Sequence, residues 1–279
     1  MATARTPSAG GAVARSLSPQ ETKKLLHLVR NAKSIEIKVS VPMAAHQPTV
    51  LSMGLDPVEA QLRHVYFFDT AGQALNRAGL IVRARRIQGG TADTVVKLRP
   101  VDPAGIDAEL KRSHAFKVEV DAMPDGTFMC SASYKGDSTG QDVLDVTHGM
   151  KTIRSLFSKE QLAFYDAHAP VGIDMNLLRI HGPILVLRAK HRPKEFKRGI
   201  TVELWLWPDG KHILEISTKC APAEAFQTGV EFRTYLERHD VDLGTKQETK
   251  TRTAMEKFKA GRKPRRRARK TGKRARRRT

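Results

Sequence analysis

Hydrophobic and polar residues alternate along several short stretches of this chain, most regularly in SIEIKVSVP at residues 34–42. Every second residue of this stretch is aliphatic, and the residues between them are Ser34, Glu36, Lys38 and Ser40. Side chains of a strand point alternately to its two faces, so the pattern predicts a strand with one apolar and one polar face. The polar face either meets solvent or lines a binding cavity, and this stretch alone leaves both open.

Seven further stretches have the composition and spacing of strands. They are residues 64–69, 79–88, 92–99, 114–121, 183–192, 199–207 and 211–219. The last two are joined by Pro208, Asp209 and Gly210, which favour a hairpin turn. Eight short strands predict a mainly β (α+β) fold, a closed eight-stranded antiparallel β-barrel forming a tunnel, with peripheral helices.

Helical patterns lie outside these strands. Ser18, Pro19 and Glu21 form a capping-box pattern that opens a short helix. Further helices are predicted at 158–168, inside an insertion near residues 140–170, and at 223–239 and 246–260. We therefore predict a flexible leader at residues 1–17, one tunnel domain at residues 18–260 and a disordered basic tail at residues 261–279.

The formal net charge of +20 indicates a negatively charged binding partner. Twelve Lys and Arg residues follow residue 261 with no acid among them, and the rest of the chain still carries a charge of +8. The tail is too highly charged to fold alone. We therefore predict that residues 262–278 either bind RNA, DNA or polyphosphate nonspecifically or only keep the protein soluble.

Other features exclude several classes of protein. No run of 18 apolar residues exists, so no membrane span is predicted, and the leader lacks the apolar centre of a secretion signal. Cys130 and Cys220 have no partner at zinc spacing and are predicted to be free thiols. These features predict a cytoplasmic protein, and they leave its oligomeric state open.

The charged residues of the predicted strands recur at alternate positions, on one face of each strand. The sets are Arg83 and Arg85; Lys97 and Arg99; Lys117, Glu119 and Asp121; Arg188, Lys190 and Arg192; Glu203 and Trp205; and Glu215, Ser217 and Lys219. A solvated outer face is the ordinary explanation for any one strand. The abundance of arginine and the confinement of the acids to a few strands favour inward faces that line a tunnel.

A tunnel of this composition would bind a polyanion. Arginine guanidinium groups match the oxygens of phosphate bidentately, and lysine ammonium groups add positive charge. Carboxylates on the same wall would repel phosphate unless a divalent cation bridged the two, and oxygen ligands suit Mg²⁺ or Mn²⁺.

In their order and spacing these segments resemble the CYTH domain, the family of triphosphate tunnel metalloenzymes, which includes class IV adenylate cyclases, thiamine triphosphatases and inorganic triphosphatases. The Glu-x-Glu-x-Lys signature of the family falls on Ser34, Glu36 and Lys38. Other matching segments span roughly residues 34–255: LNRAGLIVRARR (75–86), TVVKLRP (94–100), KVEVD (117–121), LRAKHRP (187–193), VELWLWPDGKHILEIS (202–217) and KQETKTRTAM (246–255).

The resemblance implies roles for individual residues. The metal ligands would be Glu36, Glu119, Asp121, Glu203 and Glu215. The triphosphate would be held by Lys38, Arg83, Arg85, Lys97, Arg99, Arg188, Lys190, Arg192 and Lys250. Glu36 and Lys38 would act in catalysis, and the cofactor would be Mg²⁺ or Mn²⁺. In such sites phosphoryl transfer depends on positioning and on neutralising charge.

Two positions depart from the family pattern. Serine stands at positions 34 and 217, where the family has glutamates, so each of two strands lacks one carboxylate. The first hypothesis remains a metal-dependent phosphohydrolase acting on inorganic triphosphate or on a nucleoside or organic triphosphate. The alternatives are an adenylate cyclase that converts ATP to cyclic AMP, and a non-catalytic protein that binds polyphosphate or a nucleotide and uses its tail on nucleic acid.

Overall fold

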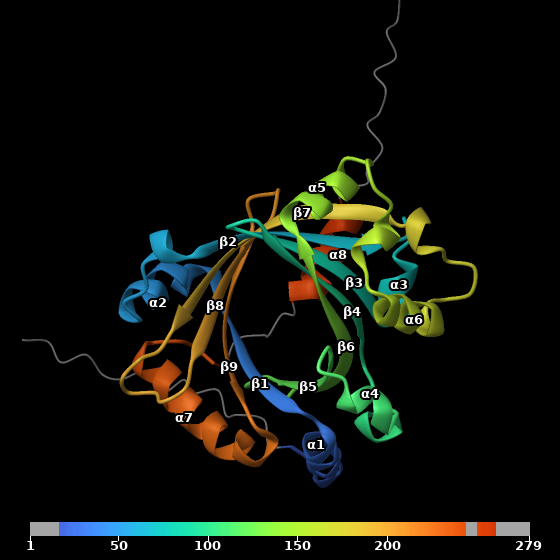
Figure 1. Ribbon diagram of the computed structural model, residues 1–279. Helices are drawn as coiled ribbons and strands as arrows, with labels where there is room; N and C mark the ends of the chain where they lie inside the picture. Colours follow the sequence, from blue (N-terminus) through green and yellow to red (C-terminus); the bar gives the residue numbers. More distant parts are fainter. Residues whose placement is uncertain (1–16, 244–249, 261–279) are drawn as a thin grey trace, which may run out of the picture.

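The computed structural model describes residues 17–243 and 250–260, and their strands close into one barrel (Figure 1). Around the barrel the order is β1-β5-β6-β4-β3-β2-β7-β8-β9. The strands are β1 Ser34–Val41, β2 Gln61–Asp69, β3 Leu80–Ile87, β4 Thr91–Leu98, β5 Phe116–Ala122, β6 Phe128–Thr139, β7 Arg179–His191, β8 Ile200–Leu206 and β9 His212–Cys220. The predicted closed barrel is confirmed. The predicted tail and most of the predicted leader lie outside the described residues, and the domain boundaries stay predictions.

The prediction of eight antiparallel strands was wrong in two respects. The described barrel has nine strands, because β6 was missed, and β1 pairs with β5 in parallel. Residues 130–134 of β6 are buried on both faces of the strand, and serine and alanine are prominent among them. A strand buried on both sides lacks the alternation of polar and apolar residues that revealed the others.

The helices surround the barrel, with one exception. Those described are α1 Pro19–Asn31, α2 His46–Ser52, α3 Ala74–Arg77, α4 Ala108–Arg112, α5 Gly140–Thr147, α6 Lys159–His168, α7 Ala225–Arg238 and α8 Lys250–Ala260. Single-turn 3₁₀ helices occupy Met43–Ala45, Pro57–Glu59, Pro103–Gly105, Ile153–Leu156, Met175–Leu177 and Pro222–Glu224. The predicted capping box of Ser18 and Glu21 is present at the start of α1. Figure 1, viewed along the barrel, shows α8 within the outline of the strands.

The outer apolar faces of the strands pack under the peripheral helices. Phe116 of β5, Tyr134 of β6 and Phe164 of α6 form one aromatic cluster, with ring centroids 4.9 to 5.8 Å apart. Burying large aromatic side chains is a major source of stability. Because these outer faces bury the apolar residues, the alternate residues of the same strands must face the interior of the barrel.

The interior itself is divided into an apolar end and a polar part. Inward-facing residues of β2, β3, β7 and β8 form an apolar cluster with α8: Val65, Phe67, Ile81, Ile184, Val186, Trp205, Trp207 and Ala254, with Phe258 packed against it. Helix α8 therefore packs over one end of the barrel interior. The polar residues of the same strands line the remainder.

A buried aspartate fixes the turn between β2 and β3. One carboxylate oxygen of Asp69 accepts hydrogen bonds from the backbone N–H groups of Thr70 and Leu75, and the other accepts one from that of Asn76. These bonds order α3, so that β3 returns beside β2 with Arg83 opposite Phe67. The turn thereby helps to direct the arginines of β3 into the barrel.

The structure also bears on the predictions about the cysteines and about membrane-spanning helices. Cys130 and Cys220 are buried free thiols, as predicted. Within the described part of the chain, no helix has the length and apolar character needed to cross a membrane. The cytoplasmic location stays a prediction.

Candidate functional site

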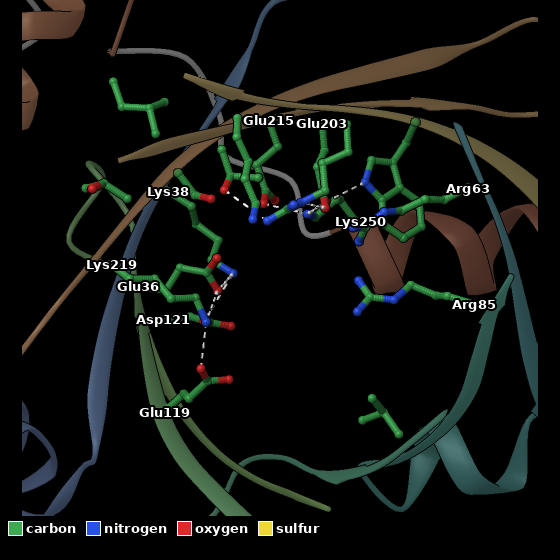
Figure 2. A pocket seen from close by; sticks show the side chains of 18 of the residues that line it. Glu36, Lys38, Arg63, Arg85, Glu119, Asp121, Glu203, Glu215, Lys219 and Lys250 are labelled. Atoms are coloured by element: carbon green, nitrogen blue, oxygen red, sulfur yellow. Dashed lines mark hydrogen bonds and ion pairs between the residues drawn. The ribbon is translucent and has the colours of Figure 1, made fainter. Parts of the chain in front are cut away.

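The polar part of the barrel interior encloses a cavity of about 470 Å³ (Figure 2). Every residue that the sequence predicted for the site lines this cavity. Twelve Lys and Arg side chains line it against five carboxylates. The cations are Lys38, Arg63, Arg83, Arg85, Lys97, Arg99, Lys135, Arg188, Lys190, Arg192, Lys219 and Lys250, and the acids are Glu36, Glu119, Asp121, Glu203 and Glu215. The cavity is thus strongly cationic.

Strand register brings these side chains together. Directly paired residues of neighbouring strands point to the same side of a sheet. Glu36 of β1 pairs with Asp121 of β5 and with Lys219 of β9. Glu203 of β8 pairs with Glu215 of β9 and with Arg188 of β7. Acids and bases far apart in the sequence therefore lie side by side on the inner wall.

The first group of acids lies on β1 and β5 and is held by two lysines. The Lys38 Nζ lies 3.1 Å from an oxygen of Glu36 and 3.1 Å from one of Asp121. The Lys219 Nζ lies 2.6 Å from Glu119 and 4.0 Å from Glu36. Figure 2 shows these five side chains on one wall, with Arg85 pointing into the cavity from the opposite wall.

The second group of acids lies on β8 and β9 and is held by α8. The Lys250 Nζ, at the start of α8, lies 2.5 Å from Glu203 and 2.6 Å from Glu215. Glu203 also accepts a hydrogen bond from the Trp205 indole and lies 3.4 Å from Arg188. Trp205, predicted on the same strand face as Glu203, thus lines the cavity and also packs with α8.

These contacts keep three of the carboxylates, Glu36, Glu119 and Glu203, ionised. Burial would raise the pKa of Glu36, but Lys38, Lys219 and Lys250 together bring it well below its usual value. In Glu119 burial is likewise outweighed, chiefly by Lys219, and its pKa falls to about 2. Lys250 does the same for Glu203, whose pKa also falls to about 2. At neutral pH these side chains accept hydrogen bonds and do not donate protons.

Other cations of the cavity have no such partner. Among the described residues, no ion pair forms at Arg63, Arg83, Lys97, Arg99, Lys135, Lys190 or Arg192. Burial and the neighbouring Arg85 lower the pKa of Arg83 to about 10, and burial lowers the pKa of Lys97. Burying a charged group without a counter-ion lowers the stability of the folded protein, and a bound anion would restore that stability.

Not every predicted cation is equally free. Arg85 makes a bidentate ion pair with Asp93, with nitrogen to oxygen distances of 2.6 to 3.1 Å. Arg188 hydrogen-bonds to Thr201 at 3.3 Å and contacts Glu203. Both residues reach the cavity, but part of their charge is already neutralised.

Sequence reasoning missed three cations of the cavity. Arg63 precedes the predicted start of its strand, and Lys135 lies on the missed strand β6. Lys219 had been placed on the charged face of its strand but not in the site. Lys219 lies opposite Glu36 because of the register between β1 and β9, which the sequence of either strand alone does not give. A regular strand extended by one or two residues would have included Arg63.

The two serines that depart from the family pattern take different places. The Ser34 hydroxyl donates a hydrogen bond of 3.3 Å to Glu119. Ser217 is buried, lines the cavity and pairs with Lys38 across β1 and β9. Neither serine adds negative charge to the acids beside it.

The five carboxylates do not form a metal site as their side chains lie. Within residues 17–243 and 250–260, no three or more His, Cys, Asp and Glu residues gather so as to hold a metal ion. Mg²⁺ requires several oxygen ligands at about 2.0–2.1 Å. Here lysine ammonium groups lie between the neighbouring acids instead. Binding of Mg²⁺ or Mn²⁺ stays a prediction, and this arrangement does not favour it.

Comparison with known proteins gives information on the fold. No protein-family model matches the sequence, and no curated protein does. Among solved structures, a candidate adenylate cyclase from Bacillus halodurans is 12% identical, with a TM-score of 0.55 over 79% of this chain and 98% of that one.

A second similar structure is a candidate adenylyl cyclase from Hippeastrum, described as having a dominant triphosphatase activity. It is 18% identical, with a TM-score of 0.55 over 81% of this chain and 95% of that one. At such identities the similarity establishes the architecture and not the reaction. The chain therefore has the CYTH-type barrel fold that the sequence resemblance predicted.

Proposed function

We propose that the protein binds the triphosphate group of inorganic triphosphate, or of a nucleoside or organic triphosphate, in its barrel and hydrolyses a phosphoanhydride bond. One observation carries the proposal. Seven Lys and Arg side chains of the cavity have no carboxylate partner among the described residues. Arg63 is buried, Arg83, Lys97, Arg99 and Lys135 are half-buried, and only Lys190 and Arg192 are exposed. A linear polyanion supplies the charge that such a wall lacks.

The chemistry we propose is phosphoryl transfer by positioning and charge neutralisation. Arg83, Lys97 and Arg99 would hold phosphate oxygens on one wall. Lys38, held between Glu36 and Asp121, would donate a hydrogen bond to a phosphoryl oxygen and stabilise the charge that develops there. Glu36, kept ionised by its lysines, would accept a hydrogen bond from the attacking water and orient it.

The adenylate cyclase alternative uses the same cavity, with a ribose hydroxyl as the nucleophile in place of water. The names of the two similar structures support considering it, and the triphosphatase activity described for the Hippeastrum protein supports ranking hydrolysis first. Cyclic AMP from ATP would favour the cyclase. Binding without turnover of any compound would favour the non-catalytic alternative.

The test is a panel of tripolyphosphate, ATP and thiamine triphosphate, each with Mg²⁺, Mn²⁺ or EDTA. Released phosphate and cyclic AMP are both measured. We expect phosphate from at least one compound and a large loss of binding in Arg83→Met/Arg99→Met. Lys151→Met is the matched control, because Lys151 also contacts two carboxylates but lies outside the cavity. If tripolyphosphate neither binds nor is cleaved while the fold is intact, the proposal is refuted.

A further inference from the structure

The lysines between the acids of the cavity have positions that a divalent cation would otherwise take. We propose that Lys219 and Lys250 serve as built-in counter-ions, so that the cavity binds its triphosphate as the free anion and not as a metal complex. The inference rests on the triphosphate binding proposed above. It goes further in naming the ionic form of the ligand and the residues that select it.

Contact geometry supports this role for Lys250. Its ammonium nitrogen lies 2.5 Å from one carboxylate and 2.6 Å from another, so it bridges Glu203 and Glu215 directly. The two glutamates are paired in register on adjacent strands, and their mutual repulsion requires a cation between them. Lys250 supplies it from α8, and its side chain is largely buried there.

Lys219 has the corresponding place in the first group. It stands opposite Glu36 in the β1–β9 register, and its ammonium nitrogen lies 2.6 Å from Glu119. Along the inner face of β9 the residues read Glu215, Ser217 and Lys219, so the strand changes from acidic to basic within five residues. About half of the Lys219 side chain is exposed, which places it where a ligand could approach.

The charges of each group are nearly balanced without a metal. Three carboxylates on β1 and β5 face Lys38 and Lys219, and two on β8 and β9 face Lys250 and Arg188. The carboxylates therefore present little net negative charge to an incoming phosphate. A metal-bound triphosphate carries less negative charge than the free anion, so the cavity cations that have no ion pair favour the free anion.

The first measurement compares tripolyphosphate binding by calorimetry in EDTA and in excess Mg²⁺. We expect binding in EDTA to be at least as tight as in Mg²⁺. Binding that is tenfold or more tighter with Mg²⁺ would overturn the inference and leave the proposed function standing. Absence of binding in both conditions would instead overturn the proposed function, so the two failures are distinct.

The second measurement uses Mn²⁺ alone, detected by its electron paramagnetic resonance signal. Lys219→Glu replaces the counter-ion by a fourth acid near Glu36, Glu119 and Asp121, and we expect it to raise Mn²⁺ affinity at least tenfold over the unaltered protein. Lys219→Met, which only removes the charge, should give a smaller rise. If the unaltered protein binds Mn²⁺ as tightly as Lys219→Glu does, Lys219 is no counter-ion and the inference is wrong.

Discussion

Lys250→Met removes the contact by which α8, among its described side chains, neutralises the paired glutamates of the barrel. The ammonium group lies within 2.6 Å of both Glu203 and Glu215, and its side chain is largely shielded from water. Methionine preserves most of the volume and flexibility of the side chain but carries no charge. The variant therefore leaves two carboxylates facing each other, and Glu203 keeps Arg188 at 3.4 Å and the Trp205 indole at 3.2 Å as partners among the described residues.

The pKa of Glu203 gives the magnitude. Burial alone would raise it, yet Lys250 and the other partners lower it from its ordinary 4.5 to about 2. At about 1.4 kcal/mol per pH unit, this difference corresponds to about 3 kcal/mol of stability at neutral pH. Breaking a buried ion pair by removing one partner commonly costs about 3–5 kcal/mol. We therefore expect Lys250→Met to lower the free energy of unfolding by about 3 kcal/mol at pH 7.

The sign of the pH dependence follows from the direction of the pKa shift. In the unaltered protein the lowered pKa of Glu203 gives stability that is present above about pH 4.5 and is lost as the pH falls toward 2. Lys250 contributes most to lowering the pKa of Glu203, so we expect burial to raise that pKa above its ordinary value in the variant. The folded variant then takes up a proton that the unfolded chain does not hold, so its deficit should be smaller at pH 5 than at pH 7.

Urea denaturation at pH 7 and pH 5 measures both effects. The chain has two tryptophans, Trp205 and Trp207, and both pack against α8, so their fluorescence reports on this end of the barrel. Lys151→Met should show no measurable loss, and adding Glu215→Gln to Lys250→Met should recover part of the stability. A deficit below about 1 kcal/mol at pH 7, or one of equal size at both pH values, would refute the reasoning.

Three further predictions concern the core, the turn and the cavity. Phe116→Ala leaves a hole in the buried aromatic cluster and should cost about 3–5 kcal/mol, seen as a lower Tm, unlike truncation of the exposed Phe226. Asp69→Ala leaves three backbone N–H groups without their acceptor and should cost about 3 kcal/mol in urea unfolding. Burial lowers the pKa of Lys135 to about 8, so tripolyphosphate affinity should fall between pH 7 and pH 9 as this lysine loses its charge. Lys135→Arg should reduce that fall. If the affinity falls equally in both proteins, Lys135 does not take part in binding.

The sequence predicted the barrel well wherever a strand has one polar and one apolar face. The pattern at residues 34–41 reproduces β1, and the turn at residues 208–210 joins β8 and β9 as predicted. The sequence pattern did not reveal β6, because the serines and alanines of this strand are buried on both faces and show no alternation of polar and apolar residues. The parallel pairing of β1 with β5 was also beyond prediction, since alternation along one strand says nothing about which strand lies beside it.

The side on which the charged residues lie was likewise determined by the sequence. Alternation within each strand placed the strand residues predicted for the site on one face, and these residues line the cavity, whereas Lys117 on the same face of β5 does not. Their partners were decided by the tertiary structure alone. Lys219 meets Glu36 through the register of β1 and β9, and Lys250 reaches Glu203 and Glu215 because α8 packs across the end of the barrel. Charge along a strand is a local property, but the neutralisation of that charge depends on which strands and helices meet.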